Sequence, residues 1–165
     1  MSLHDTLLAD FDHEMAVTRK VLERLPDAAF AWKPHERSFG LGGLASHIAQ
    51  IPHWGEAILD RESYDLATRG PRAPEQTTTA GVLAVFDAHV AAVRHRLLER
   101  TDAQLLATWT LRRNGQAVMS MPRLAALRNF MLHHLIHHRG QLTVYLRIQN
   151  VPLPPLYGPT ADEPM

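Results

Sequence analysis

The sequence contains no cysteine in its 165 residues, and this absence excludes several kinds of chemistry at once. Without a thiol the chain can form no disulfide, offer no thiolate to a metal ion and carry no cysteine nucleophile. Any thiol chemistry that this protein performs must therefore use a thiol supplied from outside.

The sequence also lacks a net charge of either sign, since 17 Lys and Arg residues balance 17 Asp and Glu residues. A nucleic-acid-binding domain usually carries a basic face, so we expect no nucleic-acid partner. No apolar run approaches the roughly 20 residues that cross a bilayer, and residues 1–20 lack the apolar segment of a secretory signal. We therefore expect a cytoplasmic protein with no membrane partner.

The composition is otherwise ordinary for one globular domain. The chain has a mass of 18.6 kDa, with 45% hydrophobic and 21% charged residues. A chain of this size and composition can bury a sizeable core. We find no internal repeat, and we expect residues 1–165 to form a single domain. Its last part, residues 151–165, is a proline-rich tail that cannot continue a regular helix.

Apolar residues recur at helical spacing in four long segments, which predicts four long helices. They cover residues 3–25, 41–60 and 80–100, and a fourth begins after Pro122 and ends near residue 150. Helices of this length with one apolar face each are typical of an all-α four-helix bundle.

The connections between these helices differ in kind. Residues 27–40 are too short and too rich in helix breakers for another long helix, so we expect them to cross one end of the bundle. Residues 61–79 are loop-like. Residues 107–123 predict a small β-hairpin, because Asn114 and Gly115 favour a type I′ turn between two short strands.

The fourth helix is unusually rich in histidine: residues 127–147 hold four of the eleven histidines. His133 pairs with His137, and His134 with His138, at i,i+4 spacing that places each pair roughly 5–6 Å apart on one face. The face of His134 and His138 has the bulkier apolar residues, so we expect it to point inward. The alternative is that all four histidines only pack or lie on the surface.

A third inward imidazole comes from the second helix. His47 shares a face with four apolar residues, Leu44, Ile51, Trp54 and Ile58, and Pro52 should bend the helix just beyond it. A buried imidazole needs a partner for its ring nitrogens, and a metal ion would satisfy one of them. The alternative is a hydrogen-bonded core histidine. His89 is the runner-up as a fourth ligand or catalytic base, although it could simply pack or lie on the surface.

Three histidine ligands with an open position are typical of a catalytic metal site, whereas a structural zinc site more often has four ligands including cysteine. Imidazole suits zinc, nickel, iron and copper alike, so the metal is not determined. No His-Glu-x-x-His segment is present, and no glutamate beside the candidate ligands is an evident base. Since no glutamate precedes a histidine by three residues, ferritin-like di-iron chemistry is excluded.

Several segments resemble the DinB/YfiT-like family (DinB superfamily) over nearly the whole chain. They are WKP at 32–34, LGGLASHIAQIPHW at 41–54, HLIHHRGQLTVYLR at 134–147 and the following VPLPPLYG. The resemblance implies a four-helix bundle, often dimeric, with a metal held by one histidine of the second helix and two of the fourth. That pattern matches His47, His134 and His138, in agreement with the helical faces.

The resemblance also implies an activity, because some relatives act as transferases or isomerases with bacillithiol, mycothiol or glutathione. We therefore expect a metal-dependent transferase that combines an external low-molecular-weight thiol with a small electrophile. The alternatives are a metal-dependent hydrolase, or a non-enzymatic small-molecule-binding or stress protein with a structural metal.

Three residues near the second histidine pair have expected roles. Gln141, one turn beyond His138, could orient a ligand or fix a ring nitrogen of that histidine, although it could equally be a packing amide. We expect Arg139 to be structural and Gly140 to permit close approach of another helix.

Overall fold

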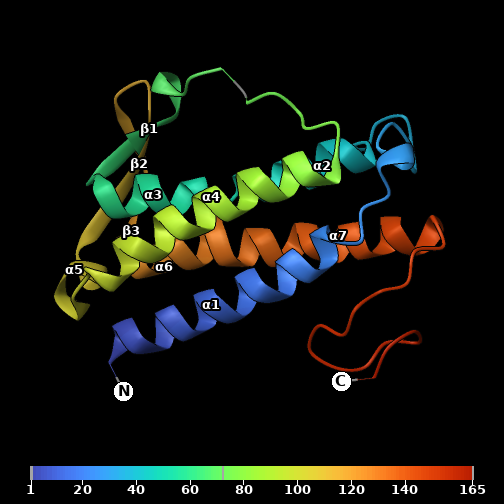
Figure 1. Cartoon of the computed structure of the whole chain (residues 1–165). Coiled ribbons are helices and arrows are strands. Elements are labelled where there is room, and N and C mark those ends of the chain that lie inside the picture. The colour runs from blue at the N-terminus through green and yellow to red at the C-terminus, as the bar shows by residue number, and fades with distance from the viewer. Residues whose placement is uncertain (1, 72, 165) are drawn as a thin grey trace.

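Helices make up most of the structure, a computed structural model that describes residues 2–71 and 73–164 (Figure 1). The α-helices are α1 (Leu3–Leu22), α2 (Leu41–Gln50), α3 (His53–Asp60), α4 (Thr79–Leu98), α5 (Asp102–Leu106), α6 (Arg123–Leu127) and α7 (His134–Ile148). A small three-stranded sheet accompanies them, so the protein is mostly helical and not all-α as expected. None of the described helices is both long and apolar enough to cross a bilayer.

The helix starts follow from capping residues that can be identified in the sequence. Ser2 and Asp5 form a capping box at the start of α1, in which each side chain accepts a hydrogen bond from the other residue's backbone N–H. The hydroxyl of Thr78 accepts a hydrogen bond from the backbone N–H of Gly81 at the start of α4. Thr101 and Gln104 form a second capping box, at the start of α5.

The segment predicted as one helix over residues 41–60 is divided into α2 and α3. The division falls at Ile51 and Pro52, because proline has no N–H to donate to the preceding turn. Both residues keep right-handed helical backbone angles, so α3 restarts directly afterwards at His53. The predicted disturbance just past His47 is therefore present, as a break between two helices.

The histidine-rich segment is also interrupted. Between α6 and α7 the backbone forms a π-helical stretch, η3 (Arg128–His133), in which hydrogen bonds span five residues rather than four. An extra residue in a turn rotates the rest of the helix by about 100° relative to a regular α-helix. The sequence did not predict this stretch, which ends immediately before His134.

The sheet combines the predicted hairpin with one further strand. Strands β2 (Thr108–Arg113) and β3 (Gln116–Pro122) pair antiparallel, and the short strand β1 (Ser63–Asp65) pairs parallel to β2. The turn residues Asn114 and Gly115 have positive φ angles of 52° and 76°, as a type I′ turn requires. The predicted hairpin is therefore confirmed.

The extra strand is attached to this hairpin through one carboxylate. Asp65, at the end of β1, accepts hydrogen bonds from the backbone N–H groups of Asn114 and Gly115 at 3.0 and 2.6 Å. Hydrogen bonds from backbone N–H groups, that of Ala67 first, lower the pKa of Asp65. Strand β1 lies within the segment expected to be loop, since three residues are too few to show a strand period.

The core lies between helices that are distant in sequence. Helix α1 packs against α4 and α7, and α2 packs against the same two helices. The segment of residues 27–40 lies at the end of the molecule away from the sheet (Figure 1), and its Phe30 and Trp32 pack against the core. Trp32 meets Tyr145 of α7 edge to face, with ring centroids 5.5 Å apart.

The proline-rich tail folds back over the helices. Asp162 accepts hydrogen bonds from Arg147 and from the backbone N–H of Leu153, and Glu163 forms a 2.7 Å ion pair with Arg24. These contacts fix residues near its end to α7 and to the segment that follows α1.

A buried arginine joins the tail to two helices. Arg139 of α7 is only 1% exposed, lies 2.8 Å from a carboxylate oxygen of Glu14 and donates to the hydroxyl of Thr18 at 3.0 Å. It also donates to the hydroxyl of Tyr157 in the tail. The expected structural role of Arg139 agrees with these contacts, although its near-complete burial was not predicted.

Candidate metal centre

The three predicted ligands meet where α2 packs against the start of α7. His47 lies in the last turn of α2, His134 is the first residue of α7, and His138 follows one turn later. Each offers a ring nitrogen, and these nitrogens all lie within 4.8 Å of one another. All three are half-buried, whereas His133 and His137 are exposed, so the inward face of the histidine helix is the predicted one.

The spacing of these nitrogens fits a metal ion. The Nε2 atoms of His47 and His134 are 3.2 Å apart. With metal–nitrogen bonds of 2.0–2.1 Å, two ligands of a tetrahedral zinc ion lie about 3.3 Å apart. The ring centroid of His138 lies 4.6 Å from that of His47 and 4.7 Å from that of His134. The donor set and its spacing therefore fit a divalent cation.

Hydrogen bonds fix the orientation of the two rings from α7. Nδ1 of His138 lies 2.7 Å from Oε1 of Gln141, which can only accept, so Nδ1 carries the hydrogen and Nε2 has a free lone pair. The ring of His134 is hydrogen-bonded to the backbone of Phe130, within the π-helical stretch. Gln141 thus occupies the position that was predicted to fix a ring nitrogen.

Burial keeps these two rings in the form that binds metals. Loss of hydration lowers the pKa of His134 below its ordinary value, and the hydrogen bond to Phe130 offsets this only in part. Burial likewise lowers the pKa of His138, against the opposing effect of Gln141. Metal ligation requires the neutral imidazole, which both shifts favour at neutral pH.

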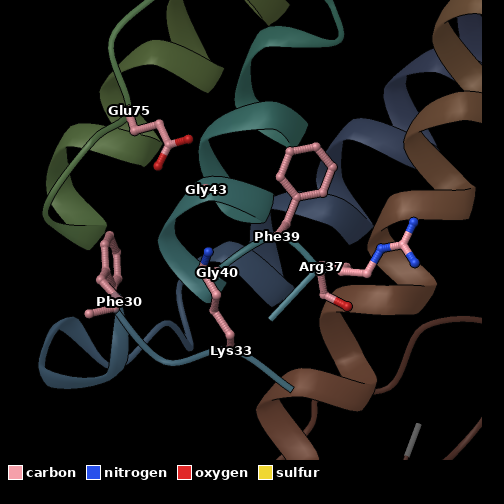
Figure 2. Close-up of a pocket in the computed structure, with 9 residues that line it drawn as sticks. Phe30, Lys33, Arg37, Phe39, Gly40, Gly43 and Glu75 are labelled. Atoms are coloured by element: carbon pink, nitrogen blue, oxygen red, sulfur yellow. The ribbon is translucent and has the colours of Figure 1, made fainter. Parts of the chain in front are cut away.

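An aromatic ring covers one side of the histidines. Phe39 stacks on His47 with centroids 5.6 Å apart and an interplanar angle of 14°, and it meets His138 edge to face at 6.3 Å. Beyond Phe39 lies an open pocket of about 340 Å³ at the start of α2 (Figure 2). Its lining includes two cations, one carboxylate and two aromatic rings: Lys33, Arg37, Glu75, Phe30 and Phe39.

A smaller hollow of about 60 Å³ lies directly against His47. Glu75 lines both this hollow and the larger pocket, and its carboxylate packs against Gly43, one turn before His47. A Cβ atom on Gly43 would lie 3.1 Å from the nearer oxygen of Glu75. The sequence showed no glutamate beside the ligands, because Glu75 follows a proline-rich segment whose path only the structure gives.

Two other candidate roles in this region are not found in the structure. His89 does not join the three-histidine group; it pairs with Glu56, 2.8 Å away, on another part of the surface. Gly140 does not permit close helix approach, because a Cβ there would meet nothing within 4 Å. The close approach occurs at Gly55 of α3, where a Cβ would lie 2.7 Å from Sδ of Met131 and 2.9 Å from Cγ1 of Val93.

Comparison with solved structures shows that the fold is a known one. A DinB-like protein from Bacillus cereus ATCC 10987 superposes with a TM-score of 0.73 over 93% of this chain and 97% of its own, at 23% identity. A DinB-like protein from Bacillus subtilis, YjoA, gives the same TM-score over 92% of this chain and 97% of its own, at 20% identity.

The sequence comparisons give the family. The uncharacterized protein YrdA of Bacillus subtilis (strain 168) is 26% identical over 160 residues, which are 96% of this chain and 90% of YrdA. The sequence profile of the DinB family matches residues 1–164. The chain therefore belongs to the DinB family.

Proposed function

We propose that this protein is a metal-dependent enzyme that transfers an external low-molecular-weight thiol to a small electrophile. The observation that carries the proposal is the 3.2 Å separation of the Nε2 atoms of His47 and His134, with His138 beside them and a pocket alongside. Such a site suits zinc, nickel or iron. When bound there, a divalent ion would stabilise a thiolate and so lower the pKa of the thiol.

The residues around the histidines would position the two reactants. Lys33 and Arg37 can attract the carboxylates that bacillithiol or glutathione would present, or another anionic group of the substrate. Phe30 and Phe39 offer apolar surface for the electrophile in the same pocket (Figure 2). Gln141 would keep Nε2 of His138 unprotonated and turned toward the metal.

A second candidate function is metal-dependent hydrolysis, and the position of Glu75 favours it. This carboxylate lines the hollow beside His47, where it could accept a proton from an attacking water. In the thiol reaction Glu75 would accept the thiol proton instead. The two activities therefore share a site and differ in the nucleophile.

The test uses protein loaded separately with zinc, nickel or iron(II), mixed with each thiol and an aryl chloride activated by nitro groups. In the transfer a sulfur–carbon bond forms, the carbon–chlorine bond breaks, chloride leaves and the thiol proton passes to Glu75 or solvent. Thioether formation well above the spontaneous rate, and lost in His134→Ala, would support the proposal. Hydrolysis of an ester panel without thiol, lost in Glu75→Gln, would support the alternative.

The absence of both reactions from fully loaded protein would overturn an enzymatic role for these substrates. A rise in the melting temperature on metal binding would then favour the non-enzymatic alternative, a small-molecule-binding or stress protein with a structural metal. We further propose that the four packed helical segments form a four-helix bundle and that the protein is a cytoplasmic homodimer. Light scattering on the purified protein tests the dimer.

A further inference from the structure

A second group of metal-ligating side chains lies on α3 and α4, apart from the three-histidine site. His53 and Glu56 project from one face of α3 at i,i+3 spacing, and His89 faces them from α4. Their ligand atoms all lie within 4.8 Å of one another. The group therefore brings together two imidazoles and one carboxylate from two packed helices.

The two imidazoles approach the same carboxylate oxygen of Glu56. Nδ1 of His89 lies 2.8 Å from Oε1 of Glu56, and Nδ1 of His53 lies 3.5 Å from the same oxygen. The two imidazole rings are 5.2 Å apart between centroids. Ligands of a tetrahedral zinc ion are separated by about 3.3 Å, so small side-chain movements would place all three around one ion.

From this arrangement we propose that His53, Glu56 and His89 form a second site for a divalent transition-metal ion. Two histidines and one glutamate are a known catalytic zinc ligand set, in which a fourth position takes water or an exogenous ligand. Imidazole with a single carboxylate also suits nickel, cobalt and copper, and is a poor match for magnesium or calcium, which prefer all-oxygen sites.

The surroundings of Glu56 hold its carboxylate in place for such a role. Its second oxygen, Oε2, lies 3.5 Å from Arg96, so the two oxygens have different partners. Arg96 also donates to Asp60 at 2.8 Å, and this second carboxylate balances the arginine charge close to the proposed ion. Oε1 can therefore bind the metal as a single ligand atom while Oε2 keeps its ion pair.

Exposure is graded across the three ligands in a way that allows entry from solvent. The side chains of Glu56 and His89 are 19% and 24% exposed, whereas that of His53 is 60% exposed. His53 also lines a hollow of about 60 Å³ with Trp54 and Tyr64. We assign the open coordination position to the His53 side, where a water or a small anion could enter.

This inference is independent of the proposed function, because the two metal sites have no ligand residue in common. The test therefore starts from the double variant His47→Ala/His134→Ala, which removes the first site. This variant is titrated with Co²⁺ and with Zn²⁺, and binding is monitored by calorimetry and, for Co²⁺, by visible absorption. The titrations should show one metal ion bound per chain. Adding Glu56→Gln or His89→Ala should weaken that binding at least tenfold.

A matched control is available on the same helix. His95 of α4 forms an exposed pair with Glu99 at 3.6 Å and has no part in either ligand group. Adding His95→Ala to the double variant should leave the affinity unchanged. Equal binding with and without Glu56→Gln, or no binding, would overturn the proposal and leave an ordinary histidine–glutamate ion pair.

The test does not depend on the double variant being folded. In the otherwise unaltered protein, Glu56→Gln and His89→Ala should each reduce the bound metal from two equivalents to one. Circular dichroism on both single variants would check that the helices are intact. A parent that binds only one equivalent, at the three-histidine site, would contradict the second site.

Discussion

The Nε2 atoms of His47 and His134 lie 3.2 Å apart, although the two residues are 87 positions apart in the sequence. In the absence of a metal, one ring must present an N–H to the other at this distance, since two lone pairs would repel. A bound cation would replace that shared proton and accept both lone pairs. Packing of α2 against α7 thus brings two ligands to the spacing that a metal requires.

Gln141 should control metal affinity through His138. Replacing it with alanine removes the acceptor for Nδ1–H and lets the ring rotate or change tautomer, so we expect zinc affinity to fall about 10- to 100-fold. Competition with a chromogenic chelator measures this change. Gln141→Glu keeps an acceptor and should stay close to the parent.

The control for this prediction is His133→Ala, which removes an exposed imidazole from the same helical segment without touching the inward face. Its zinc affinity should match that of the parent. If Gln141→Ala binds zinc as tightly as His133→Ala, the hydrogen bond from His138 has no role in ligation.

Acid should destabilise the metal-free protein through His134 and His138. Burial lowers the pKa of both below the ordinary value of 6.5, so the unfolded chain takes up protons first as the pH falls. The stabilising contribution of the neutral rings is present above that value and is lost as the pH drops through the lower folded-state pKa values.

Urea unfolding at pH 7.5 and 5.5 measures this effect. The parent should lose more stability between the two values than His134→Gln/His138→Gln, whose side chains do not titrate. Identical losses would mean that the two rings are as easily protonated in the folded state as in the unfolded chain.

Arg139→Met should be strongly destabilising. The change leaves Glu14 without its buried cation and removes the donor to Tyr157, and losing one partner of a buried pair costs at least about 3 kcal/mol. Chemical denaturation gives the loss directly. The exposed ion pair of Arg94 with Asp12 is the comparison, and Arg94→Met should cost less than about 1 kcal/mol. Similar losses for both variants would contradict the assignment of Arg139 as a buried anchor.

Two glycine substitutions should have opposite effects. Gly55→Ala inserts a methyl group against Met131 and Val93 and should cost about 1–3 kcal/mol. Gly140→Ala adds a methyl group in open space on α7 and should stabilise by about 0.5–1 kcal/mol, since alanine is the better helix former. Thermal unfolding of both variants tests the pair, and a stable Gly55→Ala would mean that the helices separate easily there.

Features set by local spacing were the ones that the sequence predicted. The i,i+4 spacing showed that His134 and His138 share one side of the helix, and the bulkier apolar residues on that side gave the correct inward face. Asn114 and Gly115 gave the hairpin, because few residue pairs favour two positive φ angles.

Features that depend on the path of a loop or on tertiary packing were not predictable in this way. Glu75 reaches the site from a proline-rich segment with no periodicity, and strand β1 is too short to show one. The π-helical stretch before His134 changes hydrogen bonding without a distinctive residue pattern. Gly140 was given a packing role that belongs to Gly55, because spacing alone does not show which glycine meets another helix.

The most direct test of the three-histidine metal centre is elemental analysis of tag-free protein purified without chelators or added metal. The parent is compared with His47→Ala and His134→Ala, and with His133→Ala as a control for loss of an exposed histidine. We predict that the parent and the control each contain nearly one equivalent of metal per chain more than His47→Ala and His134→Ala, while circular dichroism shows intact helices in all four proteins. A parent that contains no more metal than these two variants, even after reconstitution, would contradict a metal-binding role for these histidines.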